Sequence, residues 1–134
     1  IRLMLSEGPD PKAELELARS VGFEASDLER KPSELSMGDL RKLELARTLA
    51  TKPDIMLLDE VFAGLTVGEI AQISELLAVK RKEGMTFFIV SHDLRSLEPL
   101  IDRAVVMTFG HVIAEGAFDK VMSDEKVRAA YLGH

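Results

Sequence analysis

Two acidic residues and a histidine follow two short apolar segments of this chain. Asp59 and Glu60 come directly after the run Ile55–Leu58, and His92 comes two residues after the run Thr86–Val90. Carboxylates and imidazoles are the side chains that most often bind cations or move protons in a reaction. These three residues are therefore the first candidates for a chemical site.

The segments around these residues predict a strand, a helix and a second strand. Each apolar run suits a strand buried on both faces of a parallel sheet. Between them, Thr66–Glu69 has the form of a capping box, which predicts a helix that carries Ile70, Ile73 and Leu77 inward and ends near Gly84. Ligands of parallel sheets lie at the carboxyl ends of the strands. Asp59, Glu60 and His92 are all expected there.

Two more helices are expected nearer the N-terminus. The first covers Lys12–Val21 and is ended by Gly22. The second begins at Ser36–Asp39, which also resembles a capping box, and stops at Thr51–Asp54. Helical spacing predicts an apolar side of this second helix made of Leu40, Leu43, Ala46, Leu49 and Ala50, and places Arg41, Lys42, Glu44 and Arg47 elsewhere, on its surface.

The C-terminal third predicts a hairpin and short helices. The segments Val105–Phe109 and Val112–Ala114 flank the dipeptide Gly110-His111, which is expected to form a two-residue turn. Two short helices are expected between Ala117 and Tyr131. The predicted fold class is therefore α/β, with parallel strands plus a C-terminal β-hairpin.

Composition limits the classes of function. The chain has 134 residues, which suits one modest domain, and no apolar run approaches the length of a membrane-spanning helix. It has no cysteine, which excludes disulfides and thiolate metal sites. The net charge of -6 and the few aromatic residues argue against a nucleic-acid partner.

Three segments together resemble the ATP-binding subunits of ABC transporters. Leu35–Asp39 is similar to the signature L-S-G-G-Q, Ile55–Glu60 to a Walker B strand, and Ser91–Asp93 to the switch histidine loop (H-loop). Their order and spacing match that family over nearly the whole chain. The resemblance implies the C-terminal part of a P-loop NTPase (ABC ATPase) fold. It further implies a partial helical subdomain over 1–52 and a partial nucleotide-binding core over 53–134.

Finer features resemble one group within this family. Phe62–Leu65 stands at the D-loop, where many relatives have S-A-L-D, and Ile113–Gly116 and Tyr131–Gly133 add further likeness. This set is most similar to the subunits that drive branched-chain amino-acid uptake. The subunit of the lipopolysaccharide exporter shares several of these features and is the alternative. Both predict a peripheral protein at the cytoplasmic face of the inner membrane, with permease subunits and a second ATP-binding subunit as partners.

The resemblance assigns roles at the strand ends. Asp59 would hold Mg²⁺ through water, Glu60 would polarise the attacking water as general base, and His92 would contact the γ-phosphate of ATP. A structural interpretation stays open, in which the acids end a buried strand at a solvent loop and His92 caps the next helix.

The resemblance also assigns Ser36, Gly38 and Asp39 to the ATP bound by a second subunit. A helix N-terminus offers free N–H groups to a phosphate, and glycine lets the backbone approach closely. A plain helix cap would need the same residues. The segment departs from the family at Met37, which replaces a glycine, and at Asp39, which replaces the usual glutamine. Val61 also stands where relatives usually have proline.

The sequence contains no G-x-x-x-x-G-K-[ST] loop, which would supply the cradle for the β- and γ-phosphates. Whether this chain is itself an enzyme is therefore left open by its sequence. It is either a portion of a longer ATPase, weak in ATP binding by itself, or a degenerate relative that serves as a non-catalytic interaction module.

Overall fold

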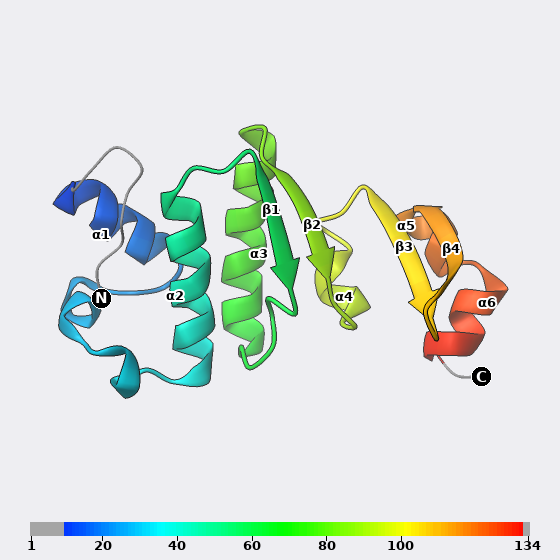
Figure 1. Cartoon of the computed structure of the whole chain (residues 1–134), viewed down its shortest axis with the longest axis horizontal. Coiled ribbons are helices and arrows are strands. Elements are labelled where there is room, and N and C mark those ends of the chain that lie inside the picture. Colours follow the sequence, from blue (N-terminus) through cyan, green and yellow to red (C-terminus); the bar gives the residue numbers. More distant parts are fainter. Residues whose placement is uncertain (1–9, 133–134) are drawn as a thin grey trace. The chain divides into compact units, whose positions relative to one another are not determined.

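The computed structural model describes residues 10–132, which divide into two compact units between Ser96 and Leu97. The first unit contains helices α1 to α3 and strands β1 and β2. The second contains strands β3 and β4 and the short helices that follow them (Figure 1). Each unit is described separately below.

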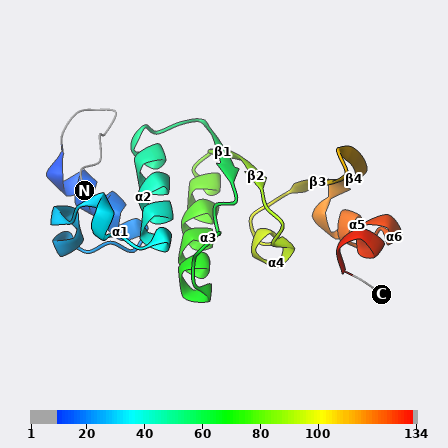
Figure 2. The same cartoon turned by 60° about the horizontal axis from the view of Figure 1, so that its bottom comes forward.

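Two helices open the first unit, close to the ranges that the sequence predicts. Helix α1 covers Pro11–Ser20, with Asp10 accepting hydrogen bonds from the first turn, and helix α2 covers Met37–Ala50, capped by Ser36. Two short 3₁₀ turns, Ala25–Glu29 and Pro32–Glu34, connect them. α1 packs beside α2 (Figures 1 and 2). This packing places the start of α2 at a defined point of the unit.

The predicted strand–helix–strand arrangement is present. Strand β1 covers Ile55–Asp59, helix α3 covers Val67–Lys82, and strand β2 covers Thr86–Val90. β1 and β2 pair in parallel, with Ile55 opposite Thr86 and Asp59 opposite Val90. The capping box at the start of α3 is complete, since Thr66 and Glu69 bind each other's backbone N–H. Strands β1 and β2 therefore end side by side (Figure 1).

The two strands are not buried on both faces, so that prediction is wrong for this chain. Met56 is buried, as are Ile73 and Leu77 of α3, but every second residue of β1 is exposed and Leu57 is 77% exposed. Phe88 of β2 is exposed in the same way. The reason is that α3 covers one face of this two-stranded sheet and no described element covers the other. The apolar runs therefore predict the two strands correctly but not the burial of their faces.

Lys42 is also not where the helical spacing predicts it. Lys42 is only 7% exposed, whereas the sequence predicts a position on the surface. α2 lies next to α3 in both views (Figures 1 and 2), and the Lys42 Nζ lies 2.9 Å from the Oε1 of Glu69 on α3, so Lys42 lies between the two helices. Phe23, itself buried, lies with its ring centroid 5.4 Å from the Lys42 Nζ. A lysine on an interhelical face is tolerated only when its charge is paired.

The second unit is built on an antiparallel hairpin. Strand β3 covers Arg103–Thr108 and strand β4 covers His111–Ala117, with an irregularity in the ladder after Val106. The turn consists of Phe109 and Gly110 rather than the predicted Gly110-His111. Both turn residues have positive φ, as a two-residue turn of type I′ requires, and His111 pairs with Thr108 instead. The prediction was one residue out of register.

Short helices close the second unit, as predicted. Helix α5 covers Phe118–Met122, helix α6 covers Glu125–Val127, and a π-helical turn covers Arg128–Leu132. Val106, Val121 and Val127 form the core of this unit. The Tyr131 hydroxyl donates to the Met107 carbonyl over 2.7 Å, which fastens the last turn to β3.

A short helix, α4, covers Leu94–Leu97 after the histidine segment. Within residues 10–132 no helix is both long enough and apolar enough to cross a bilayer. The division into a helical part over 1–52 and a nucleotide-binding part over 53–134 stays a prediction.

Candidate functional site

Glu60 and His92 are brought together at the end of the parallel sheet. The Glu60 Oε1 lies 3.0 Å from the His92 Nδ1, although 32 positions separate the residues in sequence. Both side chains reach solvent, since that of His92 is 83% exposed and that of Glu60 is 36% exposed. An acid and an imidazole at hydrogen-bond distance, both open to solvent, can share and transfer a proton.

The register of the sheet explains this contact. Asp59 and Val90 are the last paired residues of β1 and β2, and the Glu60 N–H continues the ladder by donating to the Val90 carbonyl over 2.8 Å. Glu60 then leaves the strand with φ of 48°, a left-handed conformation that is uncommon for a residue with a side chain. Residues in this conformation occur in turns, as Phe109 does in this chain, and also cluster at functional sites.

The pair has an electrostatic signature. The hydrogen bond and charge of Glu60 raise the pKa of His92 above its usual value of 6.5. The protonated imidazole is therefore favoured while it faces this carboxylate. Asp93 performs the capping role that was considered for His92, because its carboxylate accepts from the Ser96 hydroxyl and the Ser96 N–H.

Asp59 is the candidate ligand of a magnesium ion. It is exposed at the last position of β1, directly before Glu60. Within residues 10–132 no cluster of three or more acidic or histidine side chains could hold a metal by itself. Mg²⁺ in phosphate-transfer sites commonly has one or two protein carboxylates, with water and phosphate oxygens completing its octahedron. A single exposed aspartate at this edge fits that donor set.

The start of α2 is a well-formed helix cap. The Asp39 N–H donates to the Ser36 hydroxyl over 3.0 Å. The Asp39 carboxylate turns along the helix and binds the Lys42 ammonium at 2.7 Å. This hydrogen bond, together with that of Ser36, outweighs partial burial and lowers the pKa of Asp39. The acid that replaces the usual glutamine is therefore neutralised within its own helix.

Gly38 makes a close approach that its sequence context did not reveal. A Cβ at this position would lie 3.1 Å from the Gly64 carbonyl oxygen and 3.4 Å from the Leu65 side chain. The absence of a side chain lets the first turn of α2 pack directly on the loop 60–65. That loop follows Glu60 immediately, and the Ala63 N–H donates to the Glu60 carbonyl over 3.0 Å. The loop 60–65 thus connects the Ser36–Asp39 turn with Glu60.

Lys42 and Glu69 belong to this region and were missed as candidates. The Lys42 Nζ lies 2.9 Å from the Glu69 Oε1, which links α2 to the first turn of α3. The Asp39–Lys42 spacing of three on a helix is a sequence signal for an ion pair. No sequence signal shows that Glu69 completes it, because that contact depends on how α2 and α3 pack.

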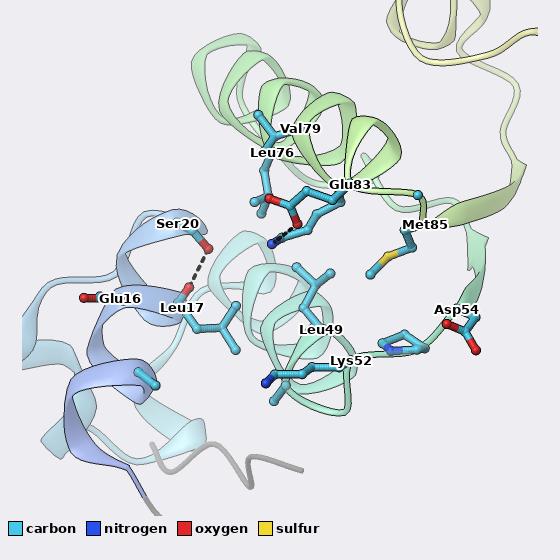
Figure 3. Close-up of a pocket in the computed structure, with 15 residues that line it drawn as sticks. Glu16, Leu17, Ser20, Leu49, Lys52, Asp54, Leu76, Val79, Glu83 and Met85 are labelled. Atoms are coloured by element: carbon cyan, nitrogen blue, oxygen red, sulfur yellow. Dashed lines mark hydrogen bonds and ion pairs between the residues drawn. The ribbon is translucent and has the colours of Figure 1, made fainter. Parts of the chain in front are cut away.

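A groove of about 620 Å³ lies elsewhere in the first unit (Figure 3). Leu17 of α1, Leu49 of α2 and Leu76 of α3 line it, together with Asp54 just before β1. β1 begins at this end, whereas Glu60 and His92 follow the opposite ends of the strands. None of the predicted site residues lines the groove, which is therefore distinct from the candidate site.

Comparison with protein families gives two matches. Residues 10–63 match the model described as ABC transporter. Residues 111–134 match the model described as branched-chain amino acid ATP-binding cassette transporter. These matches confirm the resemblance inferred from the three motifs. The first includes the Ser36–Asp39 turn and Glu60, and the second lies in the hairpin and the last helices.

Two curated relatives have similar identity to this chain. The lipopolysaccharide export system ATP-binding protein LptB of Haemophilus influenzae is 37% identical over 99 residues, covering 74% of this chain and 41% of that protein. The high-affinity branched-chain amino acid transport ATP-binding protein LivG of Salmonella typhimurium is 35% identical over 105 residues, covering 78% and 41%. The chain thus spans about two fifths of the length of these relatives.

Solved structures confirm the fold class. The ADP conformation of MJ1267, an ATP-binding cassette of an ABC transporter, aligns with a TM-score of 0.74 and 31% identity, over 90% of this chain and 48% of that one. A nucleotide-free ATP-binding cassette from an ABC transporter gives the same TM-score at 29% identity, over 95% and 58%. The α/β architecture with parallel strands and a C-terminal hairpin is that of part of such a cassette.

Proposed function

We propose, from the relationship of this chain to the ATP-binding proteins of ABC transporters, that it carries the water-activating part of a transport ATPase. The observation that carries the proposal is the 3.0 Å contact between Glu60 and His92 at the carboxyl ends of two parallel strands. Ligands of parallel sheets bind at this edge. Glu60, whose backbone has a left-handed conformation, and the exposed side chain of His92 lie at that edge and suit phosphoryl transfer to water.

The proposed reaction converts ATP and water to ADP and phosphate. Glu60 orients the attacking water and accepts its proton, which requires a charged carboxylate. His92 donates a hydrogen bond to the γ-phosphate and is tied through its Nδ1 to the same carboxylate. A phosphate bound to the imidazole would therefore also affect the position of the Glu60 carboxylate, because the two side chains are in contact.

Magnesium and the remaining phosphate contacts come from other groups. Asp59 would hold the ion through water, and a bound Mg²⁺ supplies neutralisation of the phosphate charge. Ser36, Gly38 and Asp39 would face the γ-phosphate of ATP on a second ATP-binding subunit, because the first turn of a helix offers backbone N–H groups to an anion. The phosphate-binding loop would lie in a segment that this sequence does not contain.

The finer proposal is a subunit that powers branched-chain amino-acid import at the cytoplasmic face of the cell membrane, together with permease subunits. The match of residues 111–134 to the branched-chain amino acid cassette family supports it. Lipopolysaccharide export is the alternative, and the slightly higher identity to LptB supports that. ATP-dependent uptake of leucine into vesicles that carry the matching permease would favour import, and its absence would favour the alternative.

The catalytic proposal is tested by Glu60→Gln in the protein that contains this sequence and a phosphate-binding loop. The amide keeps the shape but cannot accept the proton, so ATP turnover should fall by at least roughly 100-fold while ATP affinity is retained. Glu75→Gln, on an exposed position of α3, is the matched control.

Steady-state phosphate release and nucleotide binding by calorimetry give the two measurements. Turnover of Glu60→Gln within about threefold of the parent would show that Glu60 is not the base. Full loss of turnover in both variants would point to a general disturbance of the fold. An unmodified protein that binds ATP without hydrolysing it would favour the non-catalytic interaction module.

A further inference from the structure

Lys42 is a buried cation that joins the starts of two helices. Its ammonium lies 2.7 Å from the Asp39 carboxylate in the first turn of α2 and 2.9 Å from the Glu69 carboxylate in the first turn of α3. The side chain is 8% exposed, whereas those of Asp39 and Glu69 are 21% and 26% exposed. One lysine thus holds two carboxylates of separate helices at one point.

Each of the two acids is also fixed to the backbone of its own helix start. Glu69 accepts from the Thr66 N–H and the Thr66 hydroxyl, at 2.8 and 2.9 Å. The Asp39 N–H is held by the Ser36 hydroxyl. Movement of the Lys42 ammonium would therefore be transmitted to both helix starts rather than to two free side chains.

The loop 60–65, which precedes α3, packs against the Ser36–Asp39 turn at the start of α2. Gly38 is close to the Gly64 carbonyl and to Leu65, and a Cβ there would lie 3.1 Å from that carbonyl oxygen, so the loop would have to shift to admit a side chain. The loop 60–65 is held inside by hydrogen bonds from the Ala63 N–H to the Glu60 carbonyl and from the Leu65 N–H to the Phe62 carbonyl. The contact therefore runs from Lys42 through the Ser36–Asp39 turn to the residue that follows β1.

We propose that Lys42 is a positioning residue that fixes the Ser36–Asp39 turn against the loop 60–65, so that the phosphate-facing turn and Glu60 keep one relative placement. The ammonium acts by holding two acids at once, which a neutral side chain of similar size cannot do. Arginine could hold both acids, because its guanidinium offers five donors. The importance of this placement for ATP hydrolysis rests on the proposed function, but the placement itself does not.

The test measures backbone amide exchange by NMR in this 134-residue chain, without nucleotide. Lys42→Met should speed exchange at Asp39, Ala63 and Leu65 at least tenfold, relative to the change at Thr86. The Thr86 N–H donates to the carbonyl of Asp54, the residue before β1, and is therefore the reference within the sheet. Lys42→Arg should restore exchange to within about threefold of the original chain. Lys80→Met is the matched control, since Lys80 pairs with Glu83 at the far end of α3.

Two results would overturn the proposal. One is exchange that rises equally at Thr86 and in the loop, which would reveal only a general loss of stability. The other is a loop whose exchange does not change in Lys42→Met, or is not restored by arginine. If Lys42→Met does not fold, Glu69→Gln replaces it, because the amide keeps the Thr66 contacts and removes the charge; the same local pattern must then appear.

The outcome separates this inference from the proposed function. A loosened loop in Lys42→Met, combined with undiminished ATP turnover of Glu60→Gln in the protein that has a phosphate-binding loop, would leave the positioning role intact and refute the catalytic proposal. An unchanged loop in an active ATPase would refute the positioning role alone.

Discussion

Two charged contacts of the first unit, between Glu60 and His92 and between Lys42 and Glu69, join segments distant in sequence and differ in burial and in purpose. Glu60 and His92 meet in solvent at the end of the sheet. Lys42 meets Asp39 and Glu69 between two helices, with the lysine almost fully covered. An exposed pair contributes little to folding because water competes for both partners, whereas removal of one partner of a buried pair leaves an uncompensated charge. Burial thus separates the contact suited to chemistry from the contact suited to structure.

The largest expected effect on stability concerns the buried contact. Lys42→Met should lower the free energy of unfolding by about 2–3 kcal/mol, because two carboxylates lose a charged hydrogen-bond donor. Lys80→Met, which breaks a more exposed pair, should cost about 0.5 kcal/mol or less. Urea unfolding followed by circular dichroism gives both values. Equal costs for the two variants would remove the distinction between buried and exposed contacts.

The same contact has a pH signature. The Lys42 hydrogen bond, with those of Thr66, lowers the pKa of Glu69 from 4.5 to about 2. A group whose pKa is depressed by folding stabilises the native state above its unfolded pKa and loses that contribution as pH falls toward the folded pKa. Stability from this source is therefore complete above pH 4.5 and lost between 4.5 and about 2. In Lys42→Met the free energy of unfolding, measured by urea unfolding, should decrease less between pH 4.5 and about 2 than it does in the original chain.

An intermediate effect concerns the close approach beside the buried contact. Gly38 and Gly68 are both the second residue of their helices, but a Cβ at Gly68 meets nothing within 4 Å. Gly68→Ala should stabilise the chain by roughly 0.5–1 kcal/mol through lower unfolded-state entropy. Gly38→Ala should destabilise it by about 1 kcal/mol, because the new methyl group meets the Gly64 backbone at 3.1 Å. Thermal unfolding of both variants tests the difference, and equal stabilisation would show that the loop yields freely.

The smallest effect on stability belongs to the exposed pair. Glu60→Gln should leave the urea midpoint unchanged while lowering the pKa of His92 toward 6.5, since the hydrogen bond and charge of Glu60 raise it. The charged pair is lost as pH rises through the raised pKa of His92, because the imidazole then gives up its proton. NMR titration of the imidazole Cε1–H resonances measures this, with the His111 resonance as internal reference. An unaltered His92 titration would show that the two side chains do not interact in solution.

Local sequence signals were sufficient for most elements. Asp10 and Ser36 cap α1 and α2 within a residue of the expected starts, and Thr66 and Glu69 form the predicted capping box. The hairpin was placed one residue late, because a phenylalanine occupies the left-handed turn position that sequence rules reserve for glycine or asparagine. Such short-range patterns can be interpreted because each depends on hydrogen bonds within a few residues.

Long-range burial could not be predicted in the same way. The apolar run Ile55–Leu58 was correctly identified as a strand, yet its open face depends on which other elements are present. Lys42 was assigned to the surface because helical spacing alone does not show which side of α2 meets α3. Both corrections arise from packing between elements, which hydropathy along the chain does not specify.

The amino-acid sequence by itself determined the order of the elements and the chemical groups at the strand ends, Asp59, Glu60 and His92, because strand ends and motifs are local properties. Only the tertiary structure decided that Glu60 and His92 lie 3.0 Å apart, since this follows from the parallel register of Asp59 with Val90. The Lys42 contact with Glu69 was likewise decided by the packing of α2 on α3. The physical reason is that pairing and burial join residues tens of positions apart, and these contacts set both geometry and charge.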